Sequence, residues 1–564
     1  MSSLNNIIVR IIFYYLQINI VFSSLHINND PIVAVNEGKL KGSVEKLVDG
    51  SSYFSFKGIP YAAPPVGNLR FKAPLPPKSW KGVRAAKQFG SICAQFNTTF
   101  QGDEDCLFLN VYTKSLDKNA KIPVMVYIHG GSYYEGSGDF FTPDFFLQHD
   151  VILVTLNYRL ELLGFLSLEI PEVPGNAGMK DQVAALRWIQ NNIVKFGGDK
   201  GSVTIFGESS GASSVTYHML SPMSKGLFHK VIAQSGVAIN DWAIGKDSKG
   251  RAFRAGKLLG KDTNDVQELL HFFRGLNASS LTNLTIATLT PDERYRGLPE
   301  QFIPVAEKKF PNVEAFIDED PLKVLVEKHF EEVPLMLGYN SGEGLVGLKD
   351  HITKLDVYNK EPSYYVPREL VERVSREKLN DFGDRIKEFY VGNRNITEKD
   401  LNIITDMQTD MHFSFNAHRF AHLYTYHCGV SYMYRFNYET DLNIIKIALG
   451  LRDLKGASHA DELFYMFYNY LNEKPYKTQK KLRDIVFKVT KLWTNFAKTG
   501  RPTPDNDLGV TWEPYTRDGR EYLNIGEPMT MGKFADKERM ELWDKIYQES
   551  GVQHLMSSII IKRR

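Results

Sequence analysis

The residues Gly207 to Gly211 combine a serine with the glycines that a reactive turn requires. They read G-E-S-S-G, they follow the apolar run 203–206, and they precede a predicted helix over 212–220. A G-x-S-x-G sequence between a strand and a helix is typical of a nucleophile elbow, a sharp turn that holds its serine out at the apex. The two glycines permit the turn because they carry no side chain. Ser209 is therefore the predicted nucleophile.

A serine hydroxyl needs a base to take its proton, and the base needs an orienting acid. His459 follows the small residues 456–458, which favour a loop that can deliver an imidazole. Glu343 follows the strand-like run 333–337, where an acid is expected. The order Ser209, Glu343, His459 matches nucleophile, acid, base. From the residues alone, Glu343 could equally be a loop carboxylate that caps a helix.

A third requirement is a set of donors for the negative charge that develops on the attacked oxygen. His129, Gly130, Gly131 and Ser132 follow the apolar run 124–128, and His129 lies 80 residues before Ser209. Consecutive glycines leave backbone N–H groups bare and allow close approach. This spacing is typical of an H-G-G oxyanion loop, to which the N–H of Ser210 would add a donor.

The elements that must position these residues are short apolar runs separated by longer amphipathic stretches. The predicted strands are 123–128, 151–156, 203–206, 231–233 and 333–337. A helix is predicted over 181–195, with Val183, Leu186, Ile189, Ile193 and Val194 on its apolar face. Strands that alternate with helices predict an α/β fold whose large, mostly parallel central sheet is covered by helices on both faces. Chemistry is expected in loops beyond the carboxyl ends of its strands.

The whole chain favours one large domain over residues 24–547. It has 564 residues, 43% of them hydrophobic, and no proline-rich or serine-rich linker divides it. The charge-rich region 246–400 is expected to supply helices over the active-site face. Lys plus Arg number 68 and Asp plus Glu 66, so charge gives no reason to expect a nucleic-acid partner.

Residues 1–23 resemble a secretory signal peptide in composition. A basic residue, Arg10, precedes a short apolar stretch and the small residues Ser23 and Ser24. The alternative is an N-terminal membrane anchor, but Gln17 and Asn19 interrupt the apolar stretch. No later segment has the continuous apolar length of a membrane span. We therefore expect a secreted, extracellular protein without a stable membrane anchor, ending in a short tail over 548–564.

Cysteine and asparagine usage agrees with export. Cys93 and Cys106 enclose twelve residues and could close a small disulfide loop, which leaves Cys428 as a buried, inert thiol. Four N-x-S/T sequons are candidate glycosylation sites: Asn97, Asn277, Asn283 and Asn395. His418 and His422 are four residues apart, but no glutamate occupies the H-E-x-x-H position. They are interpreted as helix-surface histidines rather than metal ligands.

Several further segments resemble the type-B carboxylesterase and cholinesterase family of α/β-hydrolases. The similarity covers roughly residues 32–547 and rests on segments that occur in the family's order. They are Phe56–Ala62, Glu104–Val111, Asn157–Arg159, Leu163–Phe165, Phe196–Asp199 and Trp493–Phe496.

This resemblance implies a catalytic triad of Ser209, Glu343 and His459, with an oxyanion hole from the N–H groups of Gly131, Ser132 and Ser210. It also implies the Cys93–Cys106 disulfide and two buried ion pairs. These pairs are Arg70 with Glu104 and Arg159 with Asp199.

Two departures from the family bear on the substrate. Ser132 stands where many members have a third glycine, so its side chain narrows the approach for the acyl group of the ester. The loop 94–105 lacks the tryptophan that holds choline in cholinesterases by cation–π attraction. Trp242 resembles a family tryptophan near the acyl pocket, and it could equally be a core aromatic.

The sequence is most similar to secreted arthropod carboxylesterases. The expected function is hydrolysis of small to medium carboxylic esters through an acyl-enzyme, a mechanism that requires no metal and no organic cofactor. Two alternatives are a juvenile hormone esterase, whose elbow usually has glutamine in place of Glu208, and an adhesion protein that has lost catalysis.

Overall fold

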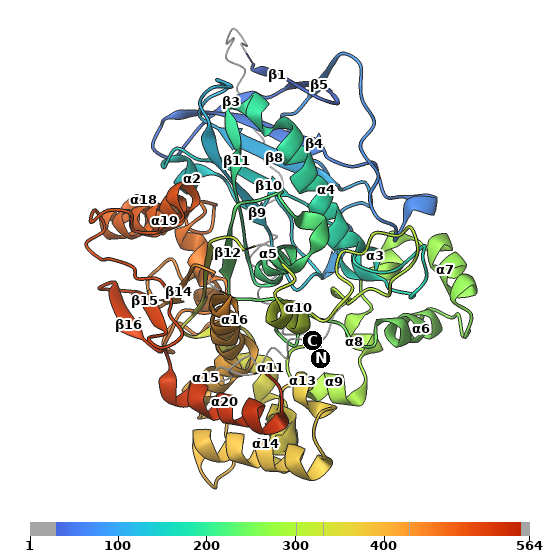
Figure 1. Ribbon diagram of the computed structural model, residues 1–564, viewed down its shortest axis with the longest axis vertical. Coiled ribbons are helices and arrows are strands. Elements are labelled where there is room, and N and C mark those ends of the chain that lie inside the picture. Colours follow the sequence, from blue (N-terminus) through green and yellow to red (C-terminus); the bar gives the residue numbers. More distant parts are fainter. Residues whose placement is uncertain (1–29, 300–301, 331, 428, 554–564) are drawn as a thin grey trace.

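An eleven-stranded sheet runs through the molecule (Figure 1). This computed structural model describes residues 30–299, 302–330, 332–427 and 429–553. The predicted signal peptide, Cys428 and the end of the predicted tail lie outside these residues. The strand order is β16-β15-β14-β13-β12-β11-β9-β10-β8-β4-β3. Neighbours from β10 through β9 and β11 to β15 are parallel, and the remaining pairs are antiparallel.

The strands of this sheet are β3 (Ser43–Lys46), β4 (Ser52–Pro60), β8 (Phe108–Thr113), β9 (Ile122–Ile128), β10 (Ile152–Leu156), β11 (Gly198–Glu208), β12 (Lys230–Gln234), β13 (Leu335–Asn340), β14 (Ser431–Phe436), β15 (Glu521–Ile525) and β16 (Thr530–Lys533). A smaller sheet contains β1 (Ile32–Val35), β2 (Gly38–Lys41) and β5 (Val83–Ala85), and β6 (Gln95–Asn97) pairs with β7 (Thr99–Gln101).

Helices cover both faces of the sheet. One face packs against α4 (Ala177–Asn192), α5 (Ser210–Leu220) and α16 (Phe415–Tyr426), the other against α2 (Asp144–Leu147) and α19 (Lys480–Thr499). Strand β9 shows why both faces need a cover. Its Val124, Val126 and Ile128 belong to the core under α4, α5 and α16, whereas Met125 and Tyr127 belong to the core under α2 and α19. Successive side chains of a strand point to opposite faces, so a continuous apolar run feeds two cores. The predicted sheet, with both faces covered, is confirmed.

The region 246–400 supplies mainly helices, which lie along the right-hand side and in the lower part of Figure 1. They are α6 (Ser248–Leu258), α7 (Val266–Gly275), α8 (Thr285–Thr288), α9 (Pro291–Tyr295), α10 (Pro321–Glu327), α11 (Leu348–Ile352), α12 (Leu355–Lys360), α13 (Arg368–Val371) and α14 (Arg376–Val391). The other helices are α3 (Glu161–Phe165), α15 (Leu401–Thr409), α17 (Ile444–Ala448), α18 (Glu473–Thr478) and α20 (Lys537–Ser550).

The predicted helix over 181–195 corresponds to α4 followed by a tighter 3₁₀ turn over Ile193–Phe196. Val183, Leu186, Ile189 and Ile193 are buried as predicted, but Val194 is exposed. The 3₁₀ turn advances the chain faster around the axis than an α-helix does. Val194 therefore leaves the apolar face on which its spacing had placed it.

One predicted buried ion pair is confirmed and the other is wrong. Arg70 binds Glu104 through two hydrogen bonds, from Nε at 2.7 Å and from Nη2 at 2.5 Å. Arg159 binds Asp181 on α4, at 2.7 Å and 2.6 Å, rather than Asp199. Asp199 lies at the amino end of β11, whereas Arg159 follows the carboxyl end of β10. These strands run in the same direction, so the two residues lie at opposite ends of the sheet.

The two histidines interpreted as surface residues are buried. His418 is fully buried on α16 and His422 is 4% exposed. The Tyr339 hydroxyl lies 3.2 Å from His418 Nε2, so a core hydroxyl and the apolar packing of α16 against the sheet account for this burial.

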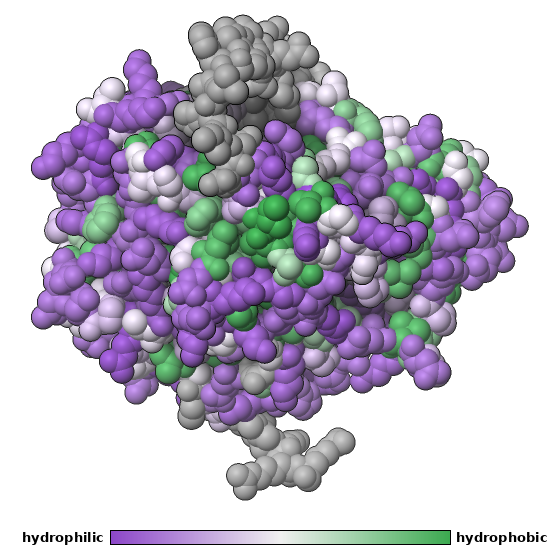
Figure 2. All heavy atoms as spheres, turned by 90° about the horizontal axis from the view of Figure 1, so that it is seen from above, coloured by the Kyte–Doolittle hydropathy of each residue, from purple (hydrophilic) through white to green (hydrophobic). Residues whose placement is uncertain are grey.

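The outer surface is largely polar. Figure 2 shows a mainly hydrophilic face with a compact apolar area near its middle. Over the described residues, no helix has both the length and the apolar character that crossing a membrane demands.

Candidate active site

Ser209 occupies the tight turn between β11 and α5. Its backbone has φ 59° and ψ −124°, a conformation that is strained for a residue with a side chain. A Cβ at Gly207 would lie 2.5 Å from the carbonyl carbon of Gly211, and one at Gly211 would lie 2.1 Å from the Ile128 oxygen. The turn thus closes only with glycine at both positions. The Ser209 N–H donates to the Gln234 carbonyl at 2.8 Å, which fixes the turn against β12.

The predicted acid and base meet beside this turn. His459 Nδ1 lies 2.6 Å from Glu343 Oε2, and Glu343 Oε1 accepts the Asn340 N–H at 2.6 Å. Glu343 is fully buried just after β13, where parallel strands end beside the carboxyl end of β11. The structure therefore brings Ser209, Glu343 and His459 to one end of the sheet, and the Nδ1–carboxylate contact directs Nε2 away from Glu343.

A second carboxylate faces the other nitrogen of the imidazole. Glu208 Oε1 lies 3.1 Å from His459 Nε2, a close charge contact without the alignment of a hydrogen bond. Burial lowers the pKa of His459, but Glu208, Glu343 and Glu462 together outweigh burial and raise it to about 9. Burial raises the pKa of Glu208 to about 7 against the opposing charge of His459, and Glu343 adds to the rise. Glu208 thus favours the protonated imidazole.

We expect Glu208→Gln to move the acid limb of the kcat/KM–pH profile to lower pH. The base must be neutral to accept a proton, so activity falls as pH drops below its pKa. Removing the carboxylate lowers the pKa of His459, by about one to three pH units for a charge at this distance. Titrating kcat/KM of the variant and the wild type checks this. An unmoved acid limb would show that Glu208 carries no charge beside His459 in the free enzyme.

The segment from His129 to Gly138 forms a loop against the nucleophile. A Cβ at Gly130 would lie 3.1 Å from the Ser209 Cβ, so the loop backbone approaches the elbow closely. Ser132 and Tyr133 have φ 57° and 59°, and the Tyr133 N–H donates to the Ser210 hydroxyl at 3.2 Å. Within the described chain, no hydrogen bond leads from the N–H groups of Gly131, Ser132 or Ser210. These three donors are available for a negative oxygen.

The imidazole is also packed by an aromatic side chain from a π-helical turn. This turn, Asp410–Ser414, joins α15 to α16. It places the Phe413 ring 4.7 Å from the His459 ring and 5.8 Å from that of Trp242. Trp242 is buried, and its indole N–H donates to the His412 carbonyl at 2.8 Å. A Cβ at Gly236 would meet both the Ser209 carbonyl and the Trp242 ring, so the indole lies beside the elbow.

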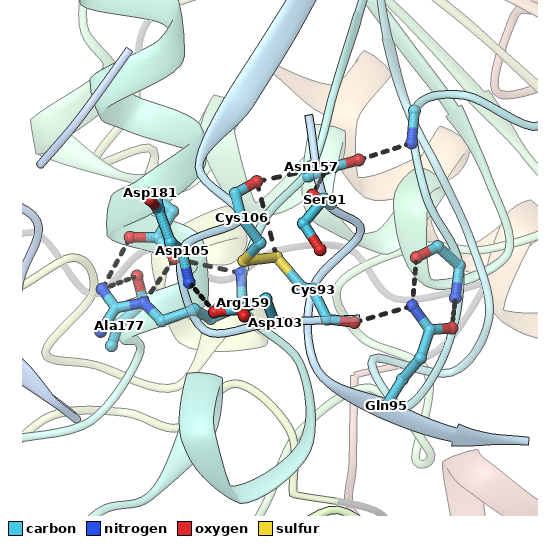
Figure 3. Close-up of a disulfide and its surroundings, with 12 residues drawn as sticks. Ser91, Cys93, Gln95, Asp103, Asp105, Cys106, Asn157, Arg159, Ala177 and Asp181 are labelled. Atoms are coloured by element: carbon cyan, nitrogen blue, oxygen red, sulfur yellow. Dashed lines mark hydrogen bonds and ion pairs between the residues drawn. A yellow bond between two sulfur atoms is a disulfide. The ribbon is translucent and has the colours of Figure 1, made fainter. Parts of the chain in front are cut away.

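The predicted disulfide between Cys93 and Cys106 is present (Figure 3). The sequon asparagines Asn277, Asn283 and Asn395 are exposed, and Asn97, inside the disulfide loop, is half-exposed. Glu319, Glu327 and His329 bring potential metal ligands together near α10. His329 lies 3.7 Å and 3.6 Å from these carboxylates and is more than half exposed, which is typical of a solvated ion-pair cluster.

Sequence reasoning missed two carboxylates and one ring at this site. Glu208 is adjacent to Ser209, and Glu462 follows His459 by three residues, so proximity in the sequence to a predicted catalytic residue is the signal that could have found both. Glu462 is buried between the amides of Asn340 and Gln234, and burial raises its pKa to about 8, with Glu208 and Glu343 adding to the rise. Phe413 had no local signal, because only the fold brings the π-helical turn to His459.

Three comparisons with known proteins identify the family of this chain. Residues 29–543 match the model of the carboxylesterase family. The chain is 34% identical to esterase E4 of Myzus persicae over 92% of its length and 94% of that protein. It is 32% identical to juvenile hormone esterase of Tribolium castaneum, with 92% of each chain covered. The crystal structure of juvenile hormone esterase from Manduca sexta superposes with a TM-score of 0.82 at 26% identity, covering 92% of this chain and all of that one.

Proposed function

Because the protein belongs to the carboxylesterase family, we propose that it hydrolyses carboxylic esters through Ser209, Glu343 and His459. The ester hydrolase activity follows from the family and from the esterases to which the chain is similar. The observation that carries the residue assignment is the 2.6 Å contact between His459 and Glu343 beside the strained elbow of Ser209.

In the proposed reaction, His459 Nε2 takes the proton of Ser209 as its oxygen attacks the ester carbonyl. The oxygen that becomes negative is held by the N–H groups of Gly131, Ser132 and Ser210. The tetrahedral intermediate collapses when His459 returns the proton to the leaving alcohol. Water then cleaves the acyl-enzyme by the same steps, releasing the carboxylic acid and regenerating Ser209.

The charge pair with Glu208 sets the protonation state in which this cycle starts. Proton transfer from Ser209 requires a neutral imidazole, and Glu208 stabilises the imidazolium. The same interaction would help once the reaction is under way, because His459 becomes positively charged as the oxyanion forms. Glu208 would then stabilise the His459 imidazolium in the transition state, and it would disfavour the neutral imidazole of the resting enzyme.

Small to medium esters are the proposed substrates. Phe413 and Trp242 lie around His459 and the elbow, and Ser132 adds a side chain at the oxyanion loop, so these groups would limit a bulky acyl group. The disulfide loop lacks the tryptophan that a choline ester would need. A juvenile hormone ester is the second candidate, favoured by similarity to the two hormone esterases.

We further propose that residues 1–23 are removed as a signal peptide and that the mature protein, one domain over 24–547 with a short tail, is secreted and N-glycosylated. The disulfide supports an oxidising compartment. The exposure of Asn277, Asn283 and Asn395 supports their use as acceptors.

A fluorophosphonate probe tests the assignment. We expect the secreted protein to be labelled at Ser209, located by mass spectrometry of the modified peptide, because only an activated serine displaces the fluoride. Labelled enzyme should lose aryl ester hydrolysis in step with the modification. A folded wild-type protein that takes up no probe would contradict the proposal and favour the adhesion alternative. A panel of short aryl esters, choline esters and juvenile hormone would then rank the candidate substrates by kcat/KM.

A further inference from the structure

The hairpin of β6 and β7, inside the Cys93–Cys106 loop, is hydrogen-bonded to the oxyanion loop. We propose that Gln95 is a positioning residue that holds the oxyanion donors in place through Gly136, with the disulfide as its anchor. This inference rests on the proposed function and adds a residue to it. All three hydrogen bonds of the Gln95 side chain go to backbone groups, so its role is to position the loop rather than to act on the ester.

Gln95 binds two segments at once with its side-chain amide. Its Nε2 donates to the carbonyls of Cys93 and Gly136, both at 3.0 Å, and its Oε1 accepts the Gly136 N–H at 2.9 Å. Gln95 is 5% exposed. Figure 3 shows the side chain next to the disulfide, with the bond to the Cys93 carbonyl drawn. Both hydrogen-bonding groups of Gly136 are therefore held by one amide that the disulfide keeps in position.

Within the oxyanion loop, Gly136 packs directly against His129 and Gly130. Its φ is 117°, and a Cβ there would lie 2.3 Å from His129 Nδ1 and 2.6 Å from the Gly130 carbonyl oxygen. There is no room for even one side-chain atom between Gly136 and Gly130, so a displacement of Gly136 is transmitted to Gly130. The peptide group that contains the Gly130 carbonyl also carries the N–H of Gly131, which is one of the proposed donors.

Two further side chains, those of Asn97 and Asn157, tie the same region to the disulfide loop and its stem. Asn97 Nδ2 donates to Glu135 Oε2 at 3.0 Å, and the Glu135 N–H donates to the Gly131 carbonyl at 3.0 Å. Asn157 accepts the Gly138 N–H at 2.8 Å and donates to the Cys106 carbonyl at 3.2 Å. The loop is thus fixed on both sides of Gly136, and Gln95 supplies the central attachment.

The consequence is selective for the transition state. The oxyanion donors matter most when charge develops on the substrate oxygen, and small misplacements of catalytic groups are costly in rate. Loss of the Gln95 bonds would leave substrate binding nearly intact, because the donors contribute little to the uncharged ester. The cost should therefore appear in kcat rather than in KM.

The test replaces Gln95 by methionine, which keeps the length and apolar packing but removes all three hydrogen bonds. We expect kcat to fall about 10- to 100-fold with little change in KM. Affinity for a trifluoromethyl ketone, which forms a tetrahedral adduct on the serine, should fall by a similar factor. Gln95→Glu, which retains an acceptor but faces two carbonyls with negative charge, should be at least as impaired.

Gln190→Met is the matched control. Gln190 also donates to two backbone carbonyls, those of Lys200 and Leu227, but it lies near the amino end of β11, away from the elbow. Its kcat should match that of the wild type. Circular dichroism and the melting temperature identify any variant that has not folded. If Gln95→Met does not fold, kcat and ketone affinity are measured on Gln95→Glu and on folded wild-type enzyme with its disulfide reduced.

The outcomes separate this inference from the proposed function. If wild-type Ser209 takes up the fluorophosphonate but folded Gln95→Met retains full kcat and full ketone affinity, the positioning role is wrong. A rise in KM alone, with unchanged kcat, would also overturn it. If wild-type Ser209 is not labelled at all, the proposed function itself fails.

Discussion

Ser209→Ala is expected to lower kcat for a simple aryl ester by about 10⁵- to 10⁶-fold, which is the scale seen when the nucleophile of a serine hydrolase is removed. Alanine cannot form the acyl-enzyme, so only the oxyanion donors and bound water could contribute. The residual rate should still exceed that of the ester in buffer, because the N–H groups of Gly131, Ser132 and Ser210 remain in place. Steady-state kinetics and loss of fluorophosphonate labelling measure the effect.

The fold should survive this change. The Ser209 backbone N–H, which binds the Gln234 carbonyl, is retained in the variant. Ser202→Ala is the matched control, because Ser202 lies near the amino end of the same strand and its hydroxyl accepts a hydrogen bond from Lys230 Nζ at 3.3 Å. An active Ser209→Ala protein, shown free of wild-type contamination, would remove the nucleophile from the proposed mechanism.

Glu343→Gln is expected to lower kcat by about 10⁴-fold, as when the acid of a related triad is replaced by its amide. Glu343 uses one oxygen for the Asn340 N–H and the other for His459. An amide has a single oxygen, so it would keep the first bond and present its NH₂ group to Nδ1. That arrangement favours the tautomer with its proton on Nε2, which cannot accept the proton of Ser209.

The comparison of Glu343→Gln with Glu45→Gln isolates this effect. Glu45 lies on edge strand β3 and pairs with Lys57, so its amide should leave kcat unchanged. Burst kinetics with an aryl ester would show whether acylation has slowed in the Glu343 variant. A loss smaller than tenfold in a folded variant would assign the orienting role to another group, with Glu208 as the nearest carboxylate to Nε2.

Much of the fold could be predicted because the relevant signals are local. The parallel strands are continuous apolar runs, and β9 feeds two cores from alternate residues. The elbow could be recognised since its glycines and serine are adjacent in the chain. Errors arose where a partner had to be chosen across space. The family resemblance predicts Asp199 as the partner of Arg159, but strand direction puts Asp199 at the other end of the sheet, and α4 supplies Asp181 instead.

The rest of the site depends on convergence of distant segments. Glu208, Glu462 and Phe413 surround His459 from the elbow, the turn after His459 and the π-helical turn before α16. No single segment of the sequence predicts that these three segments meet around His459. Val194 illustrates a smaller limit, since one 3₁₀ turn was enough to change which side of the helix it occupies.

Asp199 and Lys200 stand at the opposite end of β11 from Ser209. The strand is 11 residues long, or about 35 Å when fully extended, and Lys200 is exposed. This end of the sheet is therefore a suitable place for coupling the enzyme to a resin or an electrode. A support attached there would lie at the far end of the strand from Ser209, so ester turnover could continue on an immobilised catalyst.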